Sequence, residues 1–452
     1  MLRAGAVTSV ALTQNALAAL KTVGTRLNAV THLFKNEALQ HAQRADDELR
    51  AGHDRGLLHG LPYGLKDIVA VAGAPTTWGT PAFADQHFSQ DATVALKLRA
   101  AGAILVAKLA TVEFAGGLGY DHPLASATGA AGNPWDTTRW AHGSSSGPGA
   151  AVGAGAIPFA IGSDTAGSII FPSTACGVAG LRPTYGLVGR SGAMTLSWSL
   201  DRLGPMCRTA DDCGIVLQAI AGSDPHDPAS LPGGYRHDRQ HKAQGFRFAV
   251  LEGGTDGVDD DVRANFERSL TFLAQLGSIE RIPFPDAPWG DVLSIVMAAE
   301  AYSSFEEFII SGRLPEAVAK KAHAHRLAAS SISAPDYLRA QRIRRILAHQ
   351  FADLAAPFDA IVTPSQFTVA LPIDQPFEPG HPRVWGRPVT TAVSVVGAPS
   401  LSIINGLNAR GLPTGLHFSA APLREPALID AAMAAEAALD LRHLRPQPLA
   451  AG

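Results

Sequence analysis

The stretch DATVALKLRAAGAILVA, residues 91–107, decides the fold class of this chain. Its first part carries apolar residues at helical spacing, starts at Asp91, a residue type that caps helices, and stops at Gly102. Residues 103–107 follow as a short apolar run of the kind that forms a buried strand. A helix that leads through a glycine into an apolar strand is a common α/β unit, so we predict a helix over 91–102 and a strand over 103–107.

The same alternation continues on both sides of this stretch. Periodicity predicts helices over residues 8–21, 34–51, 209–221, 262–276 and 428–439, and a mostly helical region over 291–356. Apolar runs predict buried strands over 156–161, 246–251, 359–364 and 399–404. The polar residues 229–244 are interpreted as a linker. This pattern is typical of a large α/β protein whose second, more helical half returns to a common sheet.

The composition excludes several classes of protein. The 452 residues are 46% hydrophobic, and a net charge of -3 gives no reason to expect a nucleic-acid or anionic-membrane partner. Three cysteines without a CxxC pair indicate neither a disulfide framework nor a zinc site. We see neither a signal peptide nor an apolar run of membrane-spanning length. We therefore expect a cytoplasmic protein that binds no metal and needs no cofactor.

Three stretches rich in glycine or serine carry the chemistry, at residues 59–67, 142–148 and 162–172. A serine that attacks a carbonyl needs a base, and the resulting oxyanion needs hydrogen-bond donors. The third stretch offers Ser168 on a turn of small residues, where backbone N–H groups can approach a substrate oxygen. The first offers Lys66 after an apolar run, and burial would lower its pKa and free the amine to act as a base.

These stretches together resemble the amidase signature family, whose two catalytic serines lie 24 residues apart. Ser144, the first serine after Gly143, and Ser168 show the same separation, since 168 − 144 = 24. Residues 60–67 are similar to the lysine motif of that family. Further landmarks lie at residues 176–186, 199–205, 359–364 and 397–415. The resemblance covers about residues 8–440 and depends on the combination of motifs, because each one alone is weak.

The resemblance implies a catalytic set for this chain. Neutral Lys66 would take a proton from Ser144, which would take one from the nucleophile Ser168, and an acyl-enzyme would form on Ser168. In this family a cis peptide bond precedes the bridging serine. The oxyanion hole would be made by the backbone N–H groups of Thr165, Ala166, Gly167 and Ser168. The implied fold is a large mixed, twisted β-sheet covered by helices on both faces, in one domain over 1–452 with a variable helical portion at about 230–350.

Two departures from the family pattern bear on the substrate. His142 stands where the family usually has glycine, and Ile170 stands where it usually has an arginine that some members use near an anionic substrate group. The loss of that arginine favours a neutral substrate and leaves Asp164 without its expected partner. The predicted substrate-binding residues are Gly117, Leu118, Gly119, His142, Ile170 and Phe171.

Several interpretations compete at this point. Residues 143–147 resemble a flexible loop, and the glycines of 143–155 suggest a phosphate cradle, although the Gly-Lys-Ser/Thr ending is missing. The leading hypothesis is an amidohydrolase acting on small-molecule amides, anilides or carbamates (urethanes), without a nucleic-acid or membrane partner, as a monomer or homodimer. The alternative is the catalytic subunit of an amidotransferase that releases ammonia for a partner. A third is a non-catalytic scaffold that kept the fold.

Overall fold

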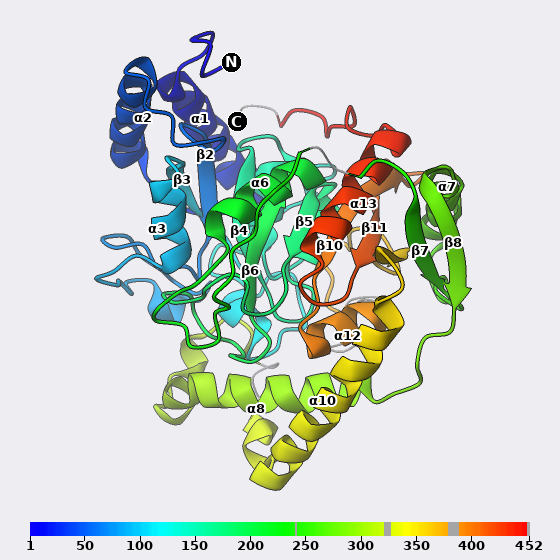
Figure 1. Cartoon of the computed structure of the whole chain (residues 1–452). Coiled ribbons are helices and arrows are strands. Elements are labelled where there is room, and N and C mark those ends of the chain that lie inside the picture. The colour runs from blue at the N-terminus through cyan, green and yellow to red at the C-terminus, as the bar shows by residue number, and fades with distance from the viewer. Residues whose placement is uncertain (240–241, 321–326, 378–387, 450–452) are drawn as a thin grey trace.

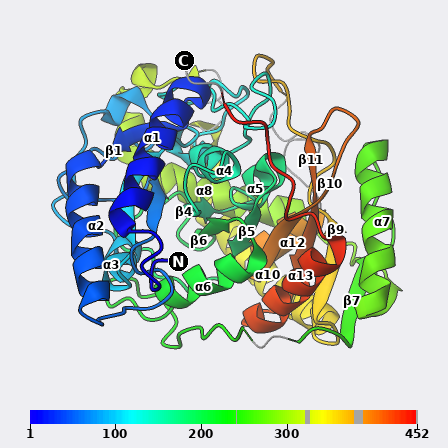
Figure 2. The same ribbon diagram turned by 90° about the horizontal axis from the view of Figure 1, so that it is seen from above.

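A single mixed sheet of 11 strands organises the molecule, in the order β1-β3-β2-β4-β6-β5-β10-β11-β9-β7-β8 (Figure 1). The computed structural model describes residues 1–239, 242–320, 327–377 and 388–449. Helices cover both faces of the sheet. Figure 2 shows α4 and α5 on one side of the central strands and α6 and α13 on the other. The predicted α/β class, with a mixed sheet between helices, is confirmed.

The first half of the chain builds one edge and the centre of the sheet. Its strands are β1 (Val30–Leu33), β2 (Pro62–Lys66), β3 (Ile104–Leu109), β4 (Phe159–Asp164), β5 (Ala179–Arg182) and β6 (Arg202–Cys207). Its helices are α1 (Ser9–Leu27), α2 (Lys35–Arg50), α3 (Thr93–Ala100), α4 (Ser146–Gly153), α5 (Ile170–Cys176) and α6 (Ala210–Ile220). The run β2, β3 and β4 is parallel, whereas β6 runs antiparallel to β4.

The second half completes the sheet and adds a layer of helices. Its strands are β7 (Phe246–Leu251), β8 (Gly277–Ile282), β9 (Ala360–Pro364), β10 (Ser400–Leu407) and β11 (Pro413–Ser419). Its helices are α7 (Asp260–Leu276), α8 (Trp289–Ile310), α10 (Ala334–Ala355), α12 (Pro388–Val396) and α13 (Glu425–Leu439). The helices α8, α10 and α12 pack on one another below the sheet in the view of Figure 1. We call these three helices the helical layer.

The local signals that start helices hold in several places. Thr209 caps α6 by accepting from the Asp212 N–H, and Ser333 caps α10 by accepting from the Asp336 N–H. The expected cap at Asp91 is wrong, because α3 begins one residue later with Ala92 at its N-cap position. The Asp91 carboxylate accepts from the Ala72 N–H at 2.8 Å instead. A tertiary contact therefore took the carboxylate that was expected to cap the helix.

The parallel strands direct the chemistry-bearing residues to one place. Because β2 and β4 run side by side in the same direction, their carboxyl ends lie at the same edge of the sheet. Lys66 is the last residue of β2 and Asp164 the last of β4. Open α/β sheets bind ligands at this edge. The fold thus brings together two segments that lie far apart in the sequence.

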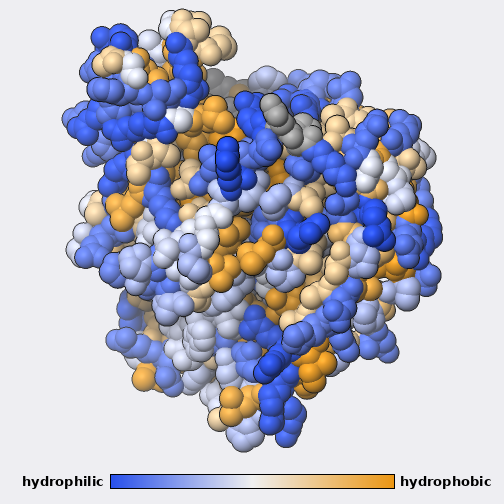
Figure 3. Space-filling model, in the orientation of Figure 1, coloured by the Kyte–Doolittle hydropathy of each residue, from blue (hydrophilic) through white to orange (hydrophobic). Residues whose placement is uncertain are grey.

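The outer surface is mixed in character. Figure 3 shows a mostly hydrophilic face with hydrophobic residues scattered over it. In the part of the chain that the structure describes, no helix combines the length and the apolar character needed to cross a membrane.

Candidate active site

Lys66 lies in the interior, with 0% of its surface exposed. Its Nζ donates to Ser144 Oγ at 2.7 Å and to Ser163 Oγ at 2.8 Å. Burial, the largest influence, lowers the pKa of Lys66 to about 7, while the charges of Asp164 and Asp201 oppose that change. A buried amine held by hydroxyl groups can be neutral near neutral pH and accept a proton.

The three consecutive serines after Gly143 have different partners. Ser144 contacts Lys66, whereas Ser145 Oγ donates to the Ser163 carbonyl at 3.1 Å and Ser146 Oγ to the Ala110 carbonyl at 3.4 Å. The Gly143–Ser144 peptide bond is cis, as the resemblance implies. The geometry therefore singles out Ser144 as the serine beside the lysine amine.

Ser168 lies on the turn that leads into α5, and its side chain is half-buried. The Ser145 N–H donates to the Ser168 carbonyl at 3.2 Å, so the two serine-bearing segments are bonded through the backbone. Among the described residues no hydrogen bond joins the Ser144 and Ser168 hydroxyls. Catalytic hydrogen bonds often close only when a ligand binds. The second step of the predicted relay stays a prediction.

The turn before Ser168 depends on a glycine. Gly167 has φ +119°, and a Cβ at this position would lie 2.2 Å from the Phe171 ring. Only glycine avoids both the strained backbone angle and this overlap. The residues Thr165, Ala166 and Gly167 therefore form a tight turn whose role as an oxyanion hole stays a prediction.

Asp164 holds this turn from the inside. Its carboxylate accepts from the N–H groups of Gly167 and Ile169, both at 2.7 Å, and forms an ion pair with Arg182 at 3.1 Å. Burial would raise the pKa of Asp164, but Arg182 and these N–H groups outweigh it and hold the pKa below its usual value. Arg182, from β5, is thus the partner of Asp164 in a chain with isoleucine at position 170.

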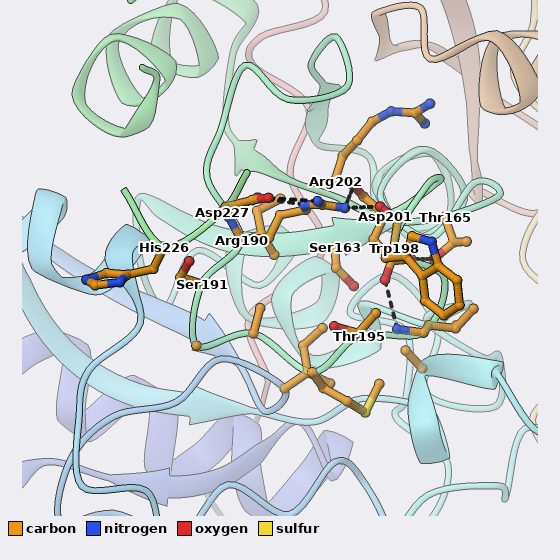
Figure 4. A pocket seen from close by; sticks show the side chains of 17 residues that line it. Ser163, Thr165, Arg190, Ser191, Thr195, Trp198, Asp201, Arg202, His226 and Asp227 are labelled. Carbon is orange, nitrogen blue, oxygen red and sulfur yellow. Dashed lines mark hydrogen bonds and ion pairs between the residues drawn. The ribbon is translucent and has the colours of Figure 1, made fainter. Parts of the chain in front are cut away.

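A cavity of about 210 Å³ lies beside the lysine site, and Ser163 and Thr165 form part of its wall (Figure 4). Asp201, on the same wall, accepts from Thr165 Oγ1 at 2.6 Å. Arg190 and Asp227 form an ion pair at 2.9 Å on another side of the cavity. Because Ser163 contacts both the cavity and Lys66 Nζ, a single hydroxyl separates this space from the lysine amine.

The predicted substrate-binding residues lie deeper than expected. Ile170 is 0% and Phe171 2% exposed, at the start of α5. His142 is buried with its ring stacked on Trp140, 4.6 Å between centroids. A Cβ on Gly117 would meet the Phe305 side chain of α8 at 2.8 Å. As far as the described residues form it, the lining of the cavity contains Thr165 but none of the residues Gly117, Leu118, Gly119, His142, Ile170 and Phe171. Their contact with substrate stays a prediction.

Three residues of the site were not predicted from the sequence. Ser163, Arg182 and Asp201 each bond a residue of the predicted set or its turn. All three lie within stretches whose patterns were noted, at 162–172, 176–186 and 199–205. Position within a motif was the available signal, but a motif does not say which side chains meet.

The fold and this arrangement define an enzyme class. The chain belongs to the amidase signature family, whose members act on carbon–nitrogen bonds, and the sequence model described as Amidase matches residues 11–429. The chain is 32% identical over 473 residues to the A subunit of glutamyl-tRNA(Gln) amidotransferase from Chloroflexus aggregans, covering 98% of this chain and 96% of that protein.

Solved structures agree with this assignment. The native peptide amidase from Stenotrophomonas maltophilia superposes with a TM-score of 0.83 at 32% identity, covering 98% of this chain and 96% of that one. The A subunit of glutamyl-tRNA(Gln) amidotransferase from Thermotoga maritima superposes with a TM-score of 0.77 at 26% identity, covering 96% and 95%.

The expectation about partners is corrected by these relatives. From the near-neutral net charge we expected a small-molecule substrate, no nucleic acid, and a monomer or homodimer. The curated relatives are named as subunits of an amidotransferase whose name includes a tRNA. Net charge reports on non-specific attraction to nucleic acid, and one component of a complex can serve a tRNA-dependent reaction without a basic surface of its own.

Proposed function

We propose that this chain cleaves a carboxamide through an acyl-enzyme on Ser168 and supplies the released ammonia to a partner, as the catalytic subunit of an amidotransferase. The observation that carries the chemistry is the 2.7 Å contact of the buried Lys66 amine with Ser144 Oγ. The relatives named as the A subunit of such an amidotransferase, similar over nearly their whole length, support the partner-dependent role.

The proposed reaction begins with the neutral amine of Lys66. It accepts the Ser144 hydroxyl proton while Ser144 accepts the Ser168 proton, and Ser168 Oγ bonds to the carbonyl carbon. The backbone N–H groups of Thr165, Ala166, Gly167 and Ser168 stabilise the oxyanion. The C–N bond then breaks, and Ser144 returns the proton to the leaving nitrogen, so ammonia departs. Water, activated by the same relay, attacks the acyl ester and releases the acid.

A second candidate is a hydrolase that works without a partner. The peptide amidase from Stenotrophomonas maltophilia is as similar to this chain as the amidotransferase component from Chloroflexus aggregans, with 32% identity in both cases. The chemistry at Ser168 is the same, and neutral amides, anilides and carbamates are the substrates that the isoleucine at position 170 favours.

The decisive experiment measures ammonia and acid release by the purified chain, alone and with copurified subunits. The panel contains glutamine, other primary amides, anilides and carbamates. Glutamine-dependent ammonia release that rises when a partner is present supports the amidotransferase role. Full activity of the chain alone on other amides contradicts that role and favours the second candidate.

The variant Ser168→Ala should lower activity by roughly 10⁴-fold or more in either case. Ser146→Ala is the matched control, because Ser146 Oγ bonds a backbone carbonyl away from the lysine. A serine-directed fluorophosphonate should label the wild type and the control but not Ser168→Ala. Activity or labelling that persists in Ser168→Ala would refute the nucleophile and revive the scaffold hypothesis.

A further inference from the structure

The loop over residues 196–201, which we call the clamp loop, joins the helical layer to the predicted oxyanion turn. On one side it contacts Glu300 of α8, a carboxylate with 0% exposure. Glu300 accepts from the Ser197 hydroxyl and from the Ser199 N–H, the latter at 3.1 Å. The Tyr337 hydroxyl of α10 donates to the same carboxylate at 2.7 Å. Glu300 therefore bonds two points of the clamp loop to two helices.

Asp201 occupies the other end of the clamp loop. One of its carboxylate oxygens accepts from the N–H groups of Leu196 and Ser197, at 2.8 and 2.9 Å, and closes the loop on itself. The other accepts from Thr165 Oγ1 at 2.6 Å. Figure 4 shows Asp201 and Thr165 side by side at the cavity, next to Trp198. The Thr165 side chain is thus fixed by a loop that is itself fixed by Glu300.

Arg344 of α10 holds the same loop from below. Its guanidinium donates to the Ser199 carbonyl at 2.7 Å and to Ser199 Oγ at 2.8 Å. It also donates to the Val395 carbonyl of α12 at 2.6 Å. All three helices of the helical layer therefore meet at the clamp loop, which has little freedom to shift without breaking bonds to charged groups.

The position of Thr165 matters for rate because its N–H belongs to the predicted oxyanion hole. Donors of an oxyanion hole act only when they are aimed in advance at the charge that develops. Within the described part of the chain, Glu300 lies away from the lysine and both serines, and it reaches the turn only through Ser197, Asp201 and Thr165. A change at Glu300 should then alter transition-state binding more than substrate binding.

We infer that Glu300 is a positioning residue, which sets the Thr165 N–H through the clamp loop and Asp201 and so couples the helical layer to the rate of acyl transfer. This inference rests on the proposed reaction at Ser168. It assigns a catalytic effect to the helical layer, whereas the sequence suggested only a variable helical portion.

The test compares Glu300→Gln with the wild type on the best substrate of the amide panel. Gln has a single acceptor oxygen where three groups donate to Glu300, so the clamp loop should loosen. We expect kcat to fall roughly 10–100-fold while KM changes less than about 3-fold. Affinity for an alkyl boronic acid, which forms a tetrahedral adduct with serine, should fall in parallel with kcat. Affinity for the product acid should stay the same.

Glu425→Gln is the matched control. Glu425 is equally buried and accepts from the Thr184 N–H at 2.6 Å, but on α13, away from the clamp loop. Both variants should lower the melting temperature, and only Glu300→Gln should lower kcat. If Glu300→Gln does not fold, Ser197→Ala removes the hydroxyl contact to Glu300 alone and takes its place.

A double-mutant cycle with Thr165→Val separates positioning from general damage. Because Thr165→Val already breaks the link to Asp201, Glu300→Gln should cost less than about 2-fold more in that background. Unchanged kcat and boronate affinity in Glu300→Gln, or additive effects in the cycle, would overturn the inference alone. Loss of Ser168-dependent activity in the wild type itself would overturn the proposed function, and this inference with it.

Discussion

Two buried lysines on neighbouring strands, Lys66 of β2 and Lys108 of β3, have opposite surroundings. Both are 0% exposed. Leu65 pairs with Lys108 and Lys66 with Leu109, so the two lysines point to opposite faces of the sheet. Lys108 forms an ion pair with Asp67 at 2.9 Å and donates to Thr76 Oγ1 at 2.7 Å. The close partners of Lys66 Nζ are two serine hydroxyls.

The difference shows how a protein makes a base from one lysine and a structural cation from the next. Burial lowers the pKa of both side chains, but at Lys108 the adjacent Asp67 opposes this directly. Asp164 and Asp201 act on Lys66 only as more distant charges. A buried lysine that contacts hydroxyl groups can lose its proton, whereas one that contacts a carboxylate gains by keeping it.

The largest effect is expected when the base itself is removed. Lys66→Met should lower kcat/KM by roughly 10⁴-fold or more, because both serines lose the group that takes their proton. The melting temperature should not fall, since an apolar side chain of similar length replaces an amine that is costly to charge there. Kinetics on the best amide and thermal unfolding check this. Substantial remaining activity would break the assignment of Lys66 as the base.

Lys108→Met should act on stability instead. It leaves Asp67 buried beside a neutral side chain, which typically costs about 3–5 kcal/mol of unfolding free energy. Denaturant unfolding measures this, and activity per folded molecule should stay well above that of Lys66→Met. Adding Asp67→Asn should recover part of the loss. Equal losses of activity in the two lysine variants would erase the distinction between them.

The pH dependence sharpens the comparison further. The neutral amine is the reactive form, so kcat/KM should rise with pH below about 7 and level off above it, following the pKa of Lys66. The stability sign agrees: a lowered lysine pKa means that stability is lost as pH falls through the folded-state value. Lys66→Met should be the more stable protein at pH 6. A flat rate profile from pH 6 to 9 would contradict a titrating lysine.

The smallest effect is expected at the second hydroxyl of the lysine site. Ser163→Ala removes an acceptor that favours the charged amine over the neutral one, so the pKa of Lys66 should fall further. The rising limb of the rate profile should move to lower pH by about 0.5–1 unit. Thr363→Val, which removes another buried hydroxyl on β9, is the control and should leave the limb in place. A shift to higher pH would mean that Ser163 stabilises the neutral amine.

The long periodic elements were predictable from the sequence, and short strands were not. The strand over 246–251 and the helix ending at Leu276 were placed within two residues of their observed bounds. The strands β1, β2, β5, β6, β8 and β11 were missed. β2 reads Pro-Tyr-Gly-Leu-Lys and has little strand propensity of its own. It is a strand because β3 and β4 bond to it on both sides.

The sequence by itself determined the α/β class, the family, and the chain positions of Lys66, Ser144 and Ser168. Periodicity and motif spacing are local, so a single chain displays them. Only the tertiary structure decided that Ser144 rather than its neighbours contacts the lysine, that Arg182 pairs with Asp164, and that Glu300 connects to Thr165. These contacts join strands, turns and helices far apart in sequence, and they exist only after parallel strands align their ends and helices pack against them.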